Sequence, residues 1–113
     1  MTTFDDGPAR GKCLTLGRLP FFLRVTRDRK GVIDALNEST DTPRADEQLF
    51  AYMLTHEPGR AFIDGAKFRG LVSCGNYRLV SDQPTDAEMR DETAWHRWCV
   101  ARPEFPPAWA KKP

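Results

Sequence analysis

The fold is decided by the stretch FLRVTRDRKGVIDAL, residues 22–36, in which two strand-like runs flank a short polar turn. The first run alternates, so that Leu23 and Val25 fall on one face of a strand and polar side chains fall on the other. The turn contains Gly31, and glycine takes a positive φ at little cost. The second run should therefore return antiparallel to the first, which predicts a β-hairpin.

Further strand-like runs lie on both sides of this hairpin in the sequence. They are 13–16, 49–54, 61–64, 71–74 and 77–80. The run 49–54 is apolar on both faces, which predicts a central strand or one that a helix covers. The segments 37–47 and 65–70 between the runs are expected to be loops.

Two short turns are predicted between these strands. Pro58-Gly59 fits the middle of a type II turn, with a positive φ at Gly59. Gly75-Asn76 fits a two-residue hairpin turn between the last two runs. Together with the turn at 28–31, they predict a series of antiparallel hairpins.

A helix is predicted after the last strand. Thr85-Asp-Ala-Glu88 is a capping box, in which side chains and backbone amides of the first turn bond reciprocally, so we expect one helix over about 86–101. Trp98 is expected on the side opposite Met89, where the C-terminal tail covers it. The side that packs onto the sheet should hold Met89, Trp95, Cys99 and Val100.

These elements predict an α+β fold. We expect a small, strongly bent antiparallel β-sheet or partly open barrel of about six strands, with one C-terminal helix packed against it. A chain of 113 residues suits one domain, which we place at 12–102. The polar, glycine-containing segment 1–11 is expected to be a flexible leader, and the proline-rich segment 103–113 an extended tail.

Charge and cysteine content limit the function classes. The 17 basic and 16 acidic residues nearly cancel, which disfavours a strongly basic nucleic-acid-binding protein. An odd number of cysteines, without a signal peptide or a long apolar stretch, predicts a soluble cytoplasmic protein with reduced thiols and no membrane contact.

No group of residues has the spacing of a known catalytic site, so we predict that the protein is not an enzyme and needs no cofactor. The four residues that could compose a zinc site are Cys13, Cys74, His96 and Cys99. Only His96 and Cys99 are closely spaced, whereas structural zinc sites have two close pairs of ligands. Small buried thiols are the more common use of free cysteines, and we assign no metal ligand.

The best candidate surface for a partner is the basic hairpin, which we define as Arg24, Arg27, Arg29 and Lys30. Its cations could bind phosphate or an acidic protein surface, or could simply protect a strand edge from pairing. Trp109 in the tail is a second candidate, because aromatic side chains often anchor protein interfaces. If the protein bound nucleic acid, Phe21, Phe22 and Tyr52 could stack on bases, although at least two of them are expected in the core.

Three runs carry a resemblance to known proteins. They are Arg18-Leu-Pro-Phe-Phe-Leu-Arg24, Asp41-Thr-Pro-Arg-Ala-Asp-Glu47 and Asp82-Gln-Pro-Thr-Asp-Ala-Glu-Met-Arg-Asp91, the last followed by Trp95 and Trp98. In these runs, and over residues 13–100, the chain resembles small uncharacterised phage and prophage accessory proteins. The resemblance supplies no catalytic residues. It implies a setting in which small proteins bind host defence complexes or other host machinery and inhibit them.

We therefore expect a non-enzymatic protein-binding accessory factor of a phage or mobile element that occludes a host protein complex as a monomer or homodimer. Inhibition of a defence system, in the manner of an anti-CRISPR protein, is one version of this hypothesis. Two alternatives stay open at this point: a small-barrel nucleic-acid-binding protein that uses the basic hairpin, and a zinc-binding module.

Overall fold

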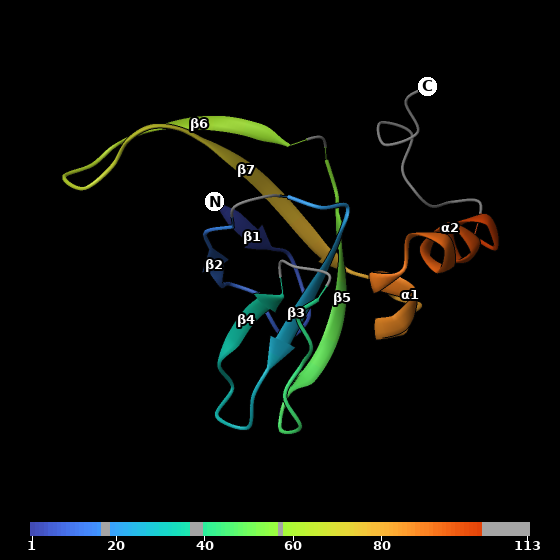
Figure 1. Ribbon diagram of the computed structural model, residues 1–113. Coiled ribbons are helices and arrows are strands. Elements are labelled where there is room, and N and C mark those ends of the chain that lie inside the picture. Colours follow the sequence, from blue (N-terminus) through green and yellow to red (C-terminus); the bar gives the residue numbers. More distant parts are fainter. Residues whose placement is uncertain (17–18, 37–39, 57, 103–113) are drawn as a thin grey trace.

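The computed structural model describes residues 1–16, 19–36, 40–56 and 58–102, and it contains a bent sheet with two short helices on one side (Figure 1). The strands are β1 (Thr2–Phe4), β2 (Cys13–Leu14), β3 (Phe22–Arg27), β4 (Ile33–Leu36), β5 (Gln48–Leu54), β6 (Gly59–Asp64) and β7 (Arg69–Leu79). The helices are α1 (Asp86–Arg90) and α2 (Glu92–Val100).

The sheet confirms the expected α+β class. Its strand order is β2-β1-β7-β5-β3-β4, nearly closed like a small barrel, and β6 pairs with β7 outside this path. All pairs are antiparallel except β1 with β7, which is parallel. The sheet is therefore mixed rather than purely antiparallel.

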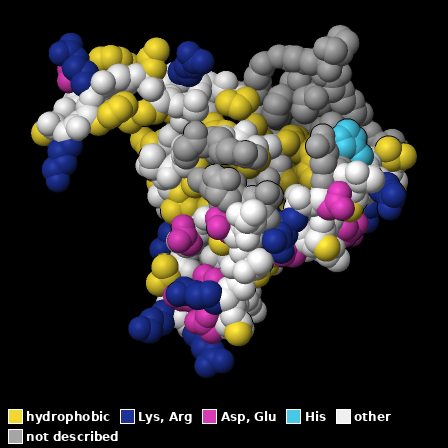
Figure 2. Space-filling view, in the orientation of Figure 1, with side chains coloured by type: hydrophobic (Ala, Val, Ile, Leu, Met, Phe, Trp, Pro, Cys, Tyr) yellow, Lys and Arg dark blue, Asp and Glu magenta, His cyan; other side chains and the backbone are white. Residues whose placement is uncertain are grey.

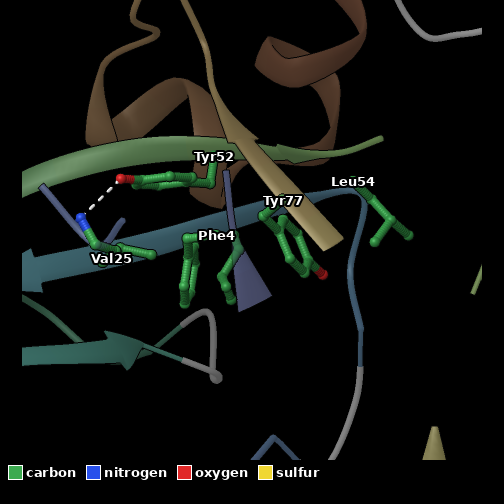
Figure 3. Close-up of a cluster of buried hydrophobic side chains, with 7 residues drawn as sticks. Phe4, Val25, Tyr52, Leu54 and Tyr77 are labelled. Atoms are coloured by element: carbon green, nitrogen blue, oxygen red, sulfur yellow. Dashed lines mark hydrogen bonds between the residues drawn. The ribbon is translucent and has the colours of Figure 1, made fainter. Parts of the chain in front are cut away.

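Apolar side chains pack on both faces of the sheet. The first cluster contains Phe4, Ala9, Leu23, Val25, Tyr52, Leu54 and Tyr77 (Figure 3). The second lies under the helices and contains Phe22, Ala51, Met53, Val80, Trp98 and Cys99. Strand β5 contributes alternate residues to the two clusters, which confirms the prediction of a strand that is apolar on both faces.

The first hairpin is also confirmed. Strands β3 and β4 pair antiparallel, with Arg27 opposite Ile33. Gly31 has a φ of 83°, and its N–H donates to the carbonyl of Asp28 at 3.0 Å. The Asp28 carboxylate accepts the N–H groups of Lys30 and Val32, which closes the turn.

The capping box at Thr85 and Glu88 is present, but the single helix predicted after it is wrong. The chain is extended at Asp91, with φ −103° and ψ 116°, and this separates α1 from α2. The Asp91 carboxylate accepts the N–H of Thr93 at 2.8 Å and so caps the second helix. A side chain well suited to an N-cap thus starts a new helix instead of continuing the first.

This break changes which side of α2 meets the sheet. Trp98, expected to point away from the sheet, is 4% exposed and meets the ring of Phe22 edge-on at 5.3 Å between centroids. Val100, expected on the packed side, is 81% exposed. Met89, Trp95 and Cys99 do pack against the second cluster as predicted.

The prediction of a flexible leader at 1–11 is wrong. Residues 2–4 form β1, and both Phe4 and Ala9 are buried. The Tyr52 hydroxyl binds the segment after β1: it donates to the carbonyl of Asp6 at 2.8 Å and accepts the Ala9 N–H at 3.0 Å. Pairing with β7, more than 70 residues away, orders this segment, and no local signal reports such a contact.

Two predicted turns are also wrong. Gly75 and Asn76 lie inside the continuous strand β7, where they pair with Thr2 and Thr3 of β1. Gly75 is needed there for close packing, since a Cβ atom would lie 3.0 Å from Cδ1 of Leu54. Gly59 begins β6 without a positive φ. The tail predicted at 103–113 lies outside the described residues.

Candidate interaction surface

Arg24 of the basic hairpin is buried and serves the fold. Its Nε donates to Oδ1 of Asp86 in α1 at 2.8 Å, and its Nη2 donates to the Asp41 carbonyl at 2.5 Å. The side chain is only 6% exposed. Arg24 therefore connects β3 to the helix and to the loop before β5, and the prediction that it contacts a partner is not supported by its position.

The other three cations of the basic hairpin lie near its turn. Arg27 is half-buried, donates to Oε1 of Gln48 at 2.6 Å, and lies over the ring of Phe50 at 5.2 Å from the centroid. Arg29 and Lys30 are exposed. Two cations therefore face solvent here, in place of the four that the sequence suggested.

A shallow depression of about 610 Å³ borders this turn. It is lined by Arg27, Asp28, Arg29, Lys30, Gly31, Asp46 and Gln48. Two acids among three cations give it a mixed charge, and the Asp28 carboxylate already occupies the amides of the turn. An anion would find few free donors there, so the depression lacks the amide cradle of a phosphate site.

A second surface projects from the body of the molecule (Figure 1). We define the arm as residues 59–74, which comprise β6, the connection 65–68 and the first half of β7. Asp64 pairs with Arg69 at its tip, and Gly59 pairs with Cys74 at its base. The register changes between the last β5 pair, Leu54 with Tyr77, and the first β6 pair, Gly59 with Cys74. The ribbon leaves the body at this point (Figure 1).

Large apolar side chains on the arm face solvent, as the yellow patches in the upper left of Figure 2 show. Phe62 is 58% exposed, Phe68 52% and Leu71 63%. Phe62 and Leu71 lie opposite each other in register, so they share one face of the ribbon. Five of the six residues of β6 are exposed, and the arm therefore adds no apolar core of its own.

Basic side chains accompany these apolar residues. The arm carries Arg60, Lys67 and Arg69 against the single acid Asp64. Arg69 lies 3.8 Å from the Asp64 carboxylate and 5.9 Å from the Phe62 ring centroid. The arm thus combines aromatic anchors with a small excess of positive charge.

The cysteines lie in different parts of the molecule. Cys13 is exposed on β2, Cys74 is half-buried at the base of the arm, and Cys99 is buried on the side of α2 that packs on the sheet. Within 1–16, 19–36, 40–56 and 58–102, no three His, Cys, Asp or Glu side chains form a group that could hold a metal ion. The geometry does not bring the candidate zinc ligands together.

The expectation that at least two of Phe21, Phe22 and Tyr52 lie in the core is confirmed, since Phe22 is 8% exposed and Tyr52 is fully buried. Phe21 is half-buried and packs on Phe22 and Trp95. The rings of Phe22 and Tyr52 are therefore not available for stacking on bases. Trp109, the second candidate anchor, lies outside the described residues.

Comparisons with protein-family models, curated proteins and solved structures found no match to this chain. Neither described helix has the length and apolar character needed to cross a bilayer.

The sequence predicted strands within the arm but not their projection from the body, because their residue pattern is the same as that of strands inside a sheet. One signal could have indicated it. Phe68 lies between Lys67 and Arg69 in a segment expected to be a loop, and an aromatic side chain in a charged loop tends to be exposed.

Proposed function

We propose that the protein is a non-enzymatic binding factor that docks on a partner protein through the arm. One observation carries this proposal: Phe62, Phe68 and Leu71 are exposed on a projecting ribbon. Large apolar side chains exposed together on one element mark interaction sites in soluble proteins. A two-stranded ribbon is also marginally stable in water without further packing, so a bound partner would stabilise it.

The resemblance to phage and prophage accessory proteins supports a host protein complex as that partner. In this role the protein occludes a functional surface of the complex and acts without chemistry of its own. The aromatic side chains supply the anchors that protein interfaces favour, while Arg60 and Lys67 suit acidic groups at the rim of the partner's binding site.

The test is capture of partners by the tagged full-length protein from a bacterial lysate, with and without nuclease. The arm variant combines Phe68→Ser with Leu71→Thr. The matched control is Val100→Ser, because Val100 is an apolar residue of α2, away from the arm (Figure 1), and is even more exposed than Phe68 and Leu71. We expect a nuclease-resistant partner that the wild type and the control retain and the arm variant loses.

Equal retention by the arm variant and the wild type would contradict the use of the arm. The basic hairpin would then be the next surface, and Arg29→Glu with Lys30→Glu tests it in the same experiment.

Nucleic-acid binding is the second candidate, because Arg60, Lys67 and Arg69 lie among the exposed rings of the arm. A two-stranded ribbon fits the major groove of DNA, and rings beside cations can stack on bases. The small charge excess favours the protein partner, since phosphate contacts dominate nucleic-acid affinity. Recovery of nucleic acid, with every bound protein lost after nuclease, would reverse this order.

A further inference from the structure

Strands β2, β4 and β6 form edges of the described sheet along their whole length, and residues 69–72 of β7 form the other edge of the arm. The β6 edge is the longest of these. Strand β2 has two residues, and β4 has four with Asp34 among them. Strand β6 has six residues and pairs only with β7 within the described part of the chain. Short length and charge are common protections against pairing at an edge, but the central residues of β6, Ala61-Phe-Ile63, carry no charge.

Opposite charges flank this uncharged centre, with Arg60 before it and Asp64 after it. If two β6 strands pair antiparallel about Phe62, Arg60 of each copy lies opposite Asp64 of the other, and the two Phe62 rings are neighbours. Opposite charges and aromatic pairs both stabilise antiparallel strands. A parallel pair in register would instead bring like charges together. The sequence of β6 is therefore complementary to itself in the antiparallel direction.

We propose that β6 pairs with β6 of a second copy of this chain and forms a symmetric dimer. The interface is isologous, because the same edge serves in both copies. Phe62 and Leu71 share a face of each arm, so the dimer joins four apolar side chains into one stripe across four strands. Ribbons of three or more strands gain the stability that a two-stranded arm lacks.

This proposal is independent of the partner proposed above. Self-pairing uses the backbone edge of β6, whereas capture of the partner is tested at Phe68 in the connection and at Leu71 on β7. A dimer can form whether or not the arm also binds a host protein.

Sedimentation equilibrium of the full chain over a range of concentrations tests the dimer. The variants are Arg60→Asp and Asp64→Arg, alone and mixed in equal amounts. In either variant alone both end pairs join like charges, so the dimer Kd is expected to rise about ten-fold or more. In the mixture both end pairs join opposite charges, so a heterodimer of about wild-type affinity should form.

If the mixture forms the heterodimer, both variants must be folded. This control is needed because Asp64→Arg removes the exposed ion pair with Arg69. Leu71→Thr is the control for the face of the arm, and it should change the dimer Kd by less than about two-fold. A wild-type chain that stays monomeric at every concentration would overturn the proposal. Variants whose mixture associates no better than each alone would overturn it too.

Discussion

The two halves of β7 belong to one continuous strand and have opposite surroundings. Residues 75–79 lie between β1 and β5, and Tyr77 there is fully buried. Residues 69–74 pair with β6, and Leu71 there is 63% exposed. Both halves contain large apolar side chains, so composition does not separate them. The neighbouring strands determine whether an apolar residue of β7 joins the core or faces solvent.

The largest expected difference between the two halves is in stability. Tyr77→Ala removes a buried ring and the hydroxyl that donates to the Pro20 carbonyl, and should lower the free energy of unfolding by about 3–5 kcal/mol. Leu71→Ala removes an exposed side chain and should change it by less than about 0.5 kcal/mol. Urea titrations followed by tryptophan fluorescence measure both. Equal losses for the two substitutions would show that the arm packs like the body.

Two arginines of the basic hairpin, Arg24 and Arg29, allow the same comparison of a buried with an exposed side chain. Arg24→Ala removes the buried partner of Asp86, whose carboxylate keeps Arg90 at 3.4 Å, and should cost about 2 kcal/mol of unfolding free energy. Arg29→Ala, at the exposed turn of the same hairpin, should cost less than about 0.5 kcal/mol. Thermal and urea unfolding of both variants provide the measurement. A small loss for Arg24→Ala would mean that its ion pair adds nothing to the attachment of α1.

Glycines on either side of the junction between body and arm should respond with opposite sign. Gly75→Ala places a Cβ atom 3.0 Å from Leu54 Cδ1 and 3.1 Å from Leu19 Cδ1, which should destabilise the protein by about 1 kcal/mol. Gly59→Ala meets no atom within 4 Å and should stabilise it by about 0.4–1 kcal/mol, because the unfolded chain loses freedom. Differential scanning calorimetry compares the two. Destabilisation by Gly59→Ala would indicate that β6 is more closely packed than its exposure implies.

The smallest expected difference is in the reactivity of two cysteine thiols, Cys74 and Cys99. This comparison needs no substitution. Burial raises the pKa of Cys99, so less thiolate forms there at a given pH, and the side chain is 7% exposed. Cys74 at the base of the arm is half-buried. Mass spectrometry after brief treatment with iodoacetamide at neutral pH should find Cys74 modified before Cys99. Modification of Cys99 before Cys74 would show that the contact between α2 and the sheet opens more readily than the base of the arm.

Local signals predicted the parts of this fold that local chemistry determines. The turn that ends in Gly31 and the capping box at Thr85 depend on neighbours in sequence, and the apolar pattern of β5 reports burial on both faces. The ordered N-terminus could not be predicted in this way, because Thr2 pairs with Gly75. The same long-range pairing makes Gly75 a packing residue, although its sequence context is that of a turn.

In the candidate interaction surface, too, features set by sequence neighbours could be predicted and features set by long-range contacts could not. Arg29 and Lys30 are exposed as the turn sequence suggested. The burial of Arg24 follows from Asp86, which lies 62 residues further along the chain. The exposure of the arm depends on where the rest of the sheet ends, and within residues 59–74 the one local signal is Phe68 between Lys67 and Arg69.

Photo-crosslinking is the most direct test of whether the arm is the surface that contacts a partner. A benzophenone side chain replaces Phe68 in one version of the tagged protein and Val100 in another, and each is irradiated in the bacterial lysate. We expect one discrete protein adduct from position 68 that position 100 does not give. Adducts of equal yield from both positions, or none from position 68, would contradict the assignment of the arm as the binding surface.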